Sequence, residues 1–226
     1  MTARSDLEDD AGIGGSAPCF LHEIGPDGKL RSDPEQFLEV ARWRKAERER
    51  LIAARLELPA EHRAAQTSLI TLHLDRLIPW APGTILSTYW PIRGEPDLRP
   101  WMRAKCEQGV RIALPVAVAP RQALQFREWR PGARMAHGLW RIPYPADGAL
   151  VVPSVVLAPV VGFDAACYRL GYGGGFFDRT LAGMTEPYLA IGLGYPSAAI
   201  PTIFPQRHDI AMHWIVAGSA PPLAAP

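Results

Sequence analysis

One stretch of the chain is more informative about its fold than any other: Gly162-Phe163-Asp164-Ala165-Ala166-Cys167-Tyr168-Arg169-Leu170-Gly171-Tyr172-Gly173-Gly174-Gly175-Phe176-Phe177-Asp178-Arg179. It follows an apolar, β-branched run from Val151 to Val161 and has glycine at positions 171, 173, 174 and 175. Because glycine has no side chain, a ligand can approach the backbone closely, and successive N–H groups can converge on an anion. The stretch predicts a phosphate-binding loop after a strand, and the alternative is a turn that only reverses the chain.

Charged residues of both signs flank these glycines. Arg169 precedes them and carries a planar fork of donors that suits phosphate oxygens. Asp178 follows them and carries a carboxylate that could hold a magnesium ion or orient a cation. A helix beginning at Phe176 would add the positive end of its dipole at the same place. The flanking charges favour a phosphate-binding loop over a plain turn.

Two well-known glycine motifs do not fit the stretch. The dinucleotide fingerprint Gly-x-Gly-x-x-Gly begins at Gly171, but Phe176 stands where the third glycine should be. The chain also has no Gly-Lys-Ser/Thr, which the Walker A loop requires. A nucleotide bound here would therefore be held by a different device.

Composition sets the broad class of the protein. The chain has 226 residues, of which 48% are hydrophobic and 21% charged, and this is enough for one good-sized core. We expect one α/β domain over residues 34–226, after a flexible extension over residues 1–33 that is rich in Gly, Ser, Asp and Pro. The net charge of +1 argues against a dedicated duplex-binding surface. We therefore expect that this protein does not bind nucleic acid.

Cysteine usage and the N-terminus indicate the compartment. The three cysteines are widely spaced without a Cys-x-x-Cys pair, so we expect neither a disulfide framework nor a thiolate zinc site. The first ten residues are acidic, and no segment is long and apolar enough to cross a bilayer. These features predict a cytoplasmic protein without membrane contact. We expect a monomer or a weak homodimer, although no sequence feature determines the oligomeric state.

Apolar periodicity predicts strands that alternate with helices. Two helices are expected first, over residues 34–58 and 59–77, and two more at 97–107 and 176–182. The expected strands are Thr84–Trp90, Arg111–Val116, Leu124–Trp129, Val151–Val161 and Tyr188–Leu193. The apolar runs are too continuous for a one-sided sheet, so the predicted fold is α/β: a single open, mostly parallel, Rossmann-like sheet with helices on both faces. Ligands of such sheets bind at the carboxyl ends of the strands, where the glycines lie.

The glycine stretch resembles the signature of the 5-formyltetrahydrofolate cyclo-ligases, also called methenyltetrahydrofolate synthetases. That family's pattern runs Phe-Asp-x-x-Gly-x-Arg-Leu-Gly-x-Gly-x-Gly-Tyr/Phe-Tyr-Asp. This chain has Phe163-Asp164, followed by Arg169-Leu170-Gly171-Tyr172-Gly173-Gly174-Gly175-Phe176-Phe177-Asp178.

Other segments follow in the order that this family has, from about Arg44 to Val216. They are the basic helix Arg44-Lys45-Ala46-Glu47-Arg48, the pair Tyr89 and Glu95-Pro96-Asp97, the run Trp140-Arg141-Ile142-Pro143-Tyr144-Pro145, and His208-Asp209. On residue patterns alone, each has a simpler interpretation: a solvated helix face, a surface carboxylate, a core tryptophan, or a strand-start pair without chemistry.

The resemblance implies an enzyme that uses ATP and Mg²⁺ to cyclise 5-formyltetrahydrofolate to 5,10-methenyltetrahydrofolate through a phosphorylated formyl group. It assigns catalytic roles to Arg169 and Asp178 and magnesium binding to Asp178 and Asp209. Its folate site would consist of Tyr89, Glu95, Trp140 and Phe177. Its ATP site would consist of Arg44, Lys45, Arg48, Arg169, Gly171, Tyr172, Gly173, Gly174, Gly175, Phe176 and Asp178. Either Arg44 or Lys45 corresponds to the family's phosphate-binding lysine.

The chain departs from the family pattern at four places, one of which is a missing glutamine near Tyr195-Pro196-Ser197. Cys167 stands where the family usually has glycine, Phe177 where it has tyrosine, and Val216-Ala217-Gly218 lacks the usual Thr-Glu. The lost tyrosine hydroxyl would lie near folate and the transferred phosphate. The alternative function is therefore a divergent, non-catalytic module that binds nucleotide or folate.

Overall fold

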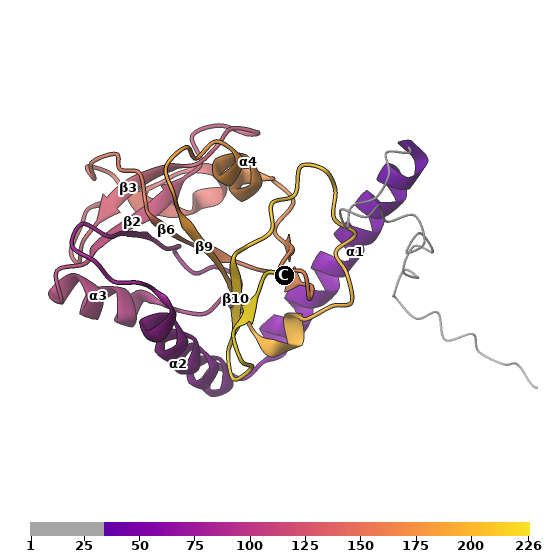
Figure 1. Cartoon of the computed structure of the whole chain (residues 1–226), viewed down its shortest axis with the longest axis horizontal. Helices are drawn as coiled ribbons and strands as arrows, with labels where there is room; N and C mark the ends of the chain where they lie inside the picture. The colour runs from indigo at the N-terminus through magenta and orange to yellow at the C-terminus, as the bar shows by residue number, and fades with distance from the viewer. Residues whose placement is uncertain (1–33) are drawn as a thin grey trace, which may run out of the picture.

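The computed structural model describes residues 34–226, and the predicted extension over residues 1–33 lies outside this range. Its central feature is a seven-stranded sheet with the order β11-β10-β9-β6-β1-β2-β3 (Figure 1). The strands are β1 (Ile85–Ser87), β2 (Arg111–Val116), β3 (Gln125–Trp129), β6 (Val155–Pro159), β9 (Leu189–Gly194), β10 (Trp214–Ala217) and β11 (Leu223–Ala224). The strands from β10 to β2 pair in parallel, and only the edge strands β11 and β3 are antiparallel. The predicted open, mostly parallel sheet is confirmed.

Both faces of the sheet are buried, as the continuous apolar runs require. In β6, Val155 and Leu157 belong to one core cluster, whereas Val156 and Ala158 belong to another. Helices α2 (Ala60–Leu77) and α3 (Arg99–Glu107) pack on the first face, and α4 (Phe176–Ala182) packs on the second (Figure 1). Alternate residues of one strand thus face opposite layers, and the predicted three-layer arrangement is confirmed.

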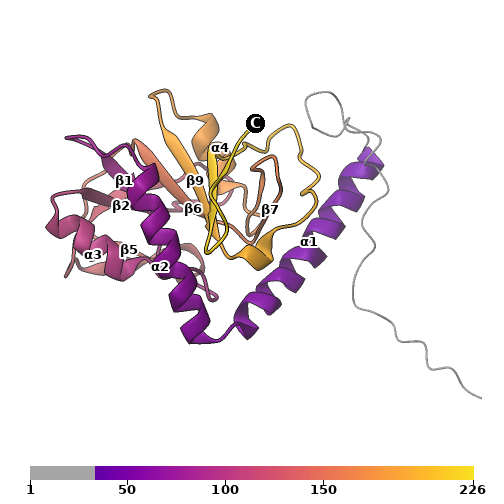
Figure 2. The same cartoon turned by 60° about the horizontal axis from the view of Figure 1, so that its bottom comes forward.

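Helix α1 (Pro34–Glu57) forms a V with α2, and the two helices meet near Pro59 (Figure 2). It packs on the hairpin of β7 (Gly162–Phe163) and β8 (Arg169–Leu170), where Leu51 contacts Val161 and Leu170. The close approach depends on a glycine, because a Cβ atom at Gly162 would lie 2.7 Å from a methyl group of Leu51. Nearer the helix start, the ring of Trp43 meets that of Phe204 edge-on at 4.9 Å. Helix α1 thereby lies beside the glycine stretch.

Several predicted elements are correct and several boundaries are wrong. Strand β2 and helix α4 have the predicted bounds, and α1, α2, α3, β3 and β9 differ by one or two residues at an end. The predicted strand over residues 151–161 shortens to β6, since Pro153 cannot donate a ladder hydrogen bond. The predicted strand over residues 84–90 shortens to β1, because the chain turns into a loop after Ser87.

Two short hairpins have no counterpart in the prediction. One is β7–β8, and the other joins β4 (Met135–His137) to β5 (Pro143–Pro145) through the short 3-10 helix η2 (Leu139–Arg141). A second 3-10 helix, η3 (Pro196–Ala198), follows β9. Strands of two or three residues give no readable alternation in a sequence. Within residues 34–226, no helix has the length and apolar content needed to span a membrane.

Candidate functional site

A pocket of about 710 Å³ opens at the carboxyl ends of β1, β2 and β6. Helix α1, the loop after β1, η2 and the glycine loop all contribute to its wall. Of the residues predicted for the site, all but Lys45 line it: Arg44, Arg48, Tyr89, Glu95, Trp140, Arg169, Gly171, Tyr172, Gly173, Gly174, Gly175, Phe176, Phe177, Asp178 and Asp209. The predicted position at the carboxyl edge of the sheet agrees with the structure.

The glycine loop, residues 171–175, presents unpaired backbone amides. Among the described residues, none of its five N–H groups donates a hydrogen bond. The N–H groups of the first turn of α4 have no partner within the helix either, as at every helix start. Gly173 (φ +91°) and Gly175 (φ +63°) adopt left-handed conformations that other residues avoid. These glycines expose a row of donors that suits an anion.

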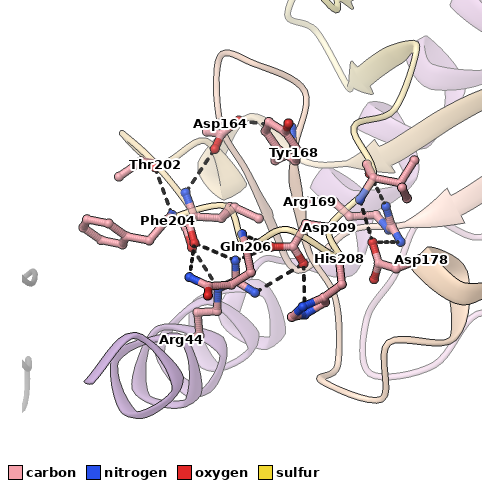
Figure 3. Close-up of polar contacts among 12 residues, drawn as sticks. Arg44, Asp164, Tyr168, Arg169, Asp178, Thr202, Phe204, Gln206, His208 and Asp209 are labelled. Atoms are coloured by element: carbon pink, nitrogen blue, oxygen red, sulfur yellow. Dashed lines mark hydrogen bonds and ion pairs between the residues drawn. The ribbon is translucent and has the colours of Figure 1, made fainter. Parts of the chain in front are cut away.

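An ion pair joins the two predicted catalytic residues beside this loop (Figure 3). Nη2 of Arg169 lies 2.9 Å from Oδ1 of Asp178, and Nη1 of Arg169 donates to the carbonyl of Ile210. The same Oδ1 accepts from the backbone N–H of Ile210 at 3.1 Å. Oδ2 of Asp178 accepts nothing from the described residues. Arg169 is thus a buried anchor, while Asp178 keeps one free oxygen at the pocket.

A second ion pair lies at the other side of the pocket (Figure 3). Nη2 of Arg44 lies 2.5 Å from Oδ2 of Asp209, and its Nη1 lies 3.4 Å from Oδ1. Arg44 also donates to the carbonyls of Ile203 and Phe204. Oδ2 of Asp209 further accepts the N–H of Gln206 at 2.6 Å. Both members are buried, so each offers little to a ligand.

The remaining predicted phosphate ligands of α1 differ in position. Arg48 donates from Nε to the carbonyl of Gly171 at 2.7 Å, and its guanidinium lies against Gly173. Neither Nη atom has a hydrogen-bond partner among the described residues. Burial and the nearby positive charge of Arg44 lower the pKa of Arg48. Lys45 is exposed and lies outside the pocket wall. Arg48 is therefore the best-placed cation for a bound phosphate.

Glu95 is buried at the opposite end of the glycine loop. Its Oε1 accepts the hydroxyl of Tyr172 at 2.6 Å, and its Oε2 accepts the N–H of Ile92 at 2.8 Å. Burial raises the pKa of Glu95, and the two hydrogen bonds and the charge of Arg55 oppose that increase. Tyr89 lies behind it, fully buried, and donates to the carbonyl of Pro96. Tyr89 is thus a wall residue of the pocket.

Trp140 projects into the pocket opening from the tip of the β4–β5 hairpin. Its side chain is 66% exposed and meets the ring of Phe176 edge-on at 5.4 Å. Trp140 (φ +56°) and Arg141 (φ +59°) both adopt left-handed conformations, which are costly for side chains of this size. Backbone strain of this kind is concentrated at ligand sites. The interpretation of Trp140 as a core residue is wrong.

Comparisons with known proteins give the family. A sequence profile of the 5-formyltetrahydrofolate cyclo-ligase family matches residues 40–218. The chain belongs to this family. The match includes the glycine loop, both ion pairs and Glu95, so it covers the pocket wall from Val40 onward.

Two cyclo-ligase relatives illustrate the distance within the family. The chain is 26% identical to the 5-formyltetrahydrofolate cyclo-ligase of Haemophilus influenzae over 176 residues, which is 75% of this chain and 93% of the relative. It is 31% identical to the 5-formyltetrahydrofolate cyclo-ligase of Mycolicibacterium smegmatis over 138 residues, which is 58% of this chain and 71% of the relative.

Two solved structures share the fold. The 5,10-methenyltetrahydrofolate synthetase of Aquifex aeolicus superimposes with a TM-score of 0.67 at 24% identity, covering 78% of this chain and 90% of that one. The enzyme of the same name from Mycoplasma pneumoniae gives 0.63 at 20% identity, covering 76% and 97%. The cyclo-ligase fold thus extends over most of the described residues.

The structure explains one departure from the family pattern. Cys167 has φ +61°, where glycine is free of strain. Its side chain is fully buried and packs in the cluster on the second face of the sheet. Phe177 lines the pocket, and the guanidinium carbon of Arg169 lies 5.8 Å from the centroid of the Phe177 ring. Cys167 therefore gains packing at a strained position, whereas Phe177 simply lacks the hydroxyl.

Sequence reasoning assigned no role in the site to two arginines near Glu95. Arg55 is buried and donates to the hydroxyl of Tyr172 at 2.7 Å. Arg93 lines the pocket with its guanidinium 5.7 Å from the Tyr172 ring. Arg55 continues the basic helix that begins at Arg44, and Arg93 belongs to no motif. Only the fold brings residues 55 and 172 together.

Proposed function

We propose that this chain catalyses the ATP-dependent cyclisation of 5-formyltetrahydrofolate to 5,10-methenyltetrahydrofolate. The main support is that one pocket contains both unpaired backbone amides, on the glycine loop, and a buried carboxylate, Glu95. The amides suit a triphosphate, and the carboxylate suits the aminopyrimidinone edge of a pterin. The chain's membership of the cyclo-ligase family and its likeness to named cyclo-ligases support the same reaction.

The nucleotide would lie along the glycine loop. Its phosphates would accept from the amides of residues 171–175 and from the Nη atoms of Arg48. Arg44 and Arg169 would act indirectly, since each is already paired with an aspartate. Their role would be to fix the α1 side of the pocket and the start of α4. Phosphoryl transfer depends mainly on such positioning and charge neutralisation.

Folate would occupy the other end of the pocket. Glu95 would accept hydrogen bonds from the pterin edge, and Trp140 would cover the ring at the opening. This arrangement would direct the N5-formyl group toward the glycine loop. Tyr89 and Phe177 would contribute apolar wall.

The chemistry proceeds in two displacements. The formyl oxygen attacks the γ-phosphorus of ATP, the bond to the β-phosphate oxygen breaks, and ADP leaves. N10 of the folate then attacks the activated formyl carbon and loses its proton, and the C–O bond breaks to release phosphate. Phosphorylation is needed because the formyl oxygen is otherwise a poor leaving group. The protein contributes alignment and no covalent intermediate.

Asp178 would hold the magnesium ion that accompanies ATP. The residues fit this ion, because Oδ2 of Asp178 has no partner among the described residues and Asp178 lines a pocket with room for phosphate. Mg²⁺ commonly binds one or two carboxylates together with substrate phosphates. Residues 34–226 contain no cluster of three metal-binding side chains, so the phosphates would supply further ligands. The ion would neutralise charge on the transferred group.

Turnover is tested directly by absorbance. The purified chain, incubated with 5-formyltetrahydrofolate and Mg-ATP, should form the methenyl product, and omission of ATP should abolish the signal. The lost hydroxyl at Phe177 should slow turnover, because one hydrogen bond contributes about 0.5–1.5 kcal/mol. Absence of ATP-dependent product at any enzyme concentration would reject the proposal. Saturable folate binding without product would instead support the non-catalytic binding module.

A further inference from the structure

Three polar groups form a line from the interior of the protein to the folate end of the pocket. Arg55 of α1 donates from Nη2 to the hydroxyl oxygen of Tyr172 at 2.7 Å. That hydroxyl donates to Oε1 of Glu95 at 2.6 Å. The three residues come from α1, the glycine loop and the loop after β1, so tertiary structure alone assembles the line.

The inner end of the line is fixed by the backbone. Arg55 is buried and donates from Nε to the carbonyl of Arg93 at 2.9 Å, with Nη1 3.4 Å from the carbonyl of Val160. Its cation has no carboxylate in direct contact among the described residues. Glu95 is the acid at the other end of the line, one tyrosine away. A buried cation and a buried carboxylate therefore balance each other through the Tyr172 hydroxyl.

Glu95 needs such support, because burial alone favours its neutral form. The ionisable groups that face it are Tyr172, Tyr89, Tyr195, Arg55 and Arg93. Of these, Tyr172 is the one that donates directly to its carboxylate. The remaining direct donor is the backbone N–H of Ile92.

We propose that Arg55 and Tyr172 are positioning residues that hold Glu95 as a fixed, ionised acceptor for the pterin edge. This inference rests on the proposed function. A carboxylate has about four lone-pair sites, and Tyr172 and Ile92 occupy one on each oxygen. One acceptor site per oxygen stays open, which matches the two parallel N–H donors of an aminopyrimidinone.

Tyr172 thereby links the two ends of the pocket. Its backbone N–H belongs to the amide row of the glycine loop, whereas its hydroxyl acts on the folate acid. The side chain and the main chain of one residue serve different substrates. Removal of the hydroxyl should therefore weaken folate binding and leave ATP binding unchanged.

The experiment is the substitution Tyr172→Phe, which deletes one oxygen atom and leaves the glycine-loop backbone intact. We expect KM and the ATP-free Kd for 5-formyltetrahydrofolate to rise about tenfold, the loss typical of a hydrogen bond to a charged group. KM for ATP should stay within about twofold of wild type, because the substitution leaves the backbone N–H groups of the glycine loop unchanged. Tyr188→Phe is the matched control, because Tyr188 packs on His213 and lies outside the pocket wall; it should change neither constant.

A pH profile separates positioning from general loosening. The hydrogen bond from Tyr172 lowers the pKa of Glu95. Without it, the carboxylate should take up its proton at higher pH, so the acid limb of kcat/KM for folate should move to higher pH in Tyr172→Phe. The same substitution in a Glu95→Gln background should produce almost no further loss of folate affinity, because the acid that it serves is gone.

The inference fails if Tyr172→Phe leaves the folate constants unchanged, raises KM for ATP equally, or adds its full effect to Glu95→Gln. These outcomes differ from failure of the proposed function, which would appear as a wild-type protein that neither binds nor converts the folate. Folate binding measured without ATP tests the roles of Arg55 and Tyr172 even in a protein with slow turnover. Arg55→Lys gives a second test: it keeps the charge but loses the fork, and it should reproduce the folate-specific loss in smaller measure.

Discussion

The two ion pairs of the pocket contain the same residue types and differ in what they leave open (Figure 3). In the Arg44–Asp209 pair, both carboxylate oxygens face the arginine, and the N–H of Gln206 adds another donor. In the Arg169–Asp178 pair, every contact falls on Oδ1, and Oδ2 accepts nothing from the described residues. The first pair is closed and the second is open.

The difference teaches where ligand chemistry can take place. A buried carboxylate that already accepts from three protein donors contributes mainly to the fold and has little capacity left for a metal ion. Asp209 is such a group, with its side chain 8% exposed, whereas Asp178 is 19% exposed and adjoins the free amides of the glycine loop. We therefore place the proposed magnesium contact at Asp178, and the prediction of a second ligand at Asp209 becomes the weaker one.

The largest effect should come from breaking the closed pair. Arg44→Met leaves the buried Asp209 carboxylate without its cation and the carbonyl of Ile203 without its donor. Removing one partner of a buried pair costs about 3–5 kcal/mol, so the midpoint of urea unfolding should fall sharply. Arg50→Met is the matched control on the same helix, because Arg50 pairs with Glu47 at the surface and should cost less than about 1 kcal/mol. Equal losses for the two variants would contradict the description of Arg44 as a structural anchor.

The second prediction compares the two aspartates directly. Asp178→Asn and Asp209→Asn each remove a carboxylate charge and should each destabilise the protein by about 1–3 kcal/mol. Only Asp178→Asn should lower the apparent affinity for Mg²⁺ in turnover, by about tenfold or more. The measurement is a magnesium titration at fixed, saturating ATP and folate. A comparable shift in Asp209→Asn would show that both pairs open when nucleotide binds.

The sequence predicted the local parts of this comparison and missed the long-range ones. Gly173 and Gly175 could be recognised as loop positions because their conformations require glycine wherever the loop lies. The pairing of Arg44 with Asp209 joins residues 165 positions apart, and no local pattern encodes it. The same holds for Tyr172 and Glu95, 77 positions apart. Motif reasoning therefore named residues that share one pocket, but it could not show which of them are already paired within the protein.

The third prediction tests the open side of the pocket through the glycine loop. Gly173→Ala places a Cβ atom on a backbone with φ +91°, 3.4 Å from the guanidinium carbon of Arg48. We expect a loss of about 1–2 kcal/mol in unfolding free energy, together with a raised KM for ATP, because the amides shift. Gly171→Ala is the control for stability, because its Cβ would point into open space and the φ of Gly171 lies outside the left-handed region. Equal destabilisation by both substitutions would show that the left-handed conformation at Gly173 is not what the loop requires.

The smallest effect concerns Glu95, the third carboxylate of the pocket wall, which is buried and has no arginine in direct contact. Burial raises its pKa in the folded protein, so the folded state holds a proton at pH values where the unfolded chain has released it. Stability should therefore fall as pH rises from the ordinary pKa of a glutamate through the raised value, and it should be level above. Glu95→Gln removes this dependence. As pH rises through that interval, the Tm of the variant should therefore increase relative to the Tm of wild type.

The measurement is a series of thermal melts between about pH 4 and pH 8 for wild type, Glu95→Gln and Tyr172→Phe. Subtracting the variant profile from that of wild type removes the contribution of Asp164, another buried carboxylate whose pKa is raised. The effect is small because Tyr172 and Ile92 already offset part of the cost of burial. For the same reason, Tyr172→Phe should show a steeper fall with pH than wild type. Parallel profiles for all three proteins would mean that Glu95 is solvated as readily as a surface acid.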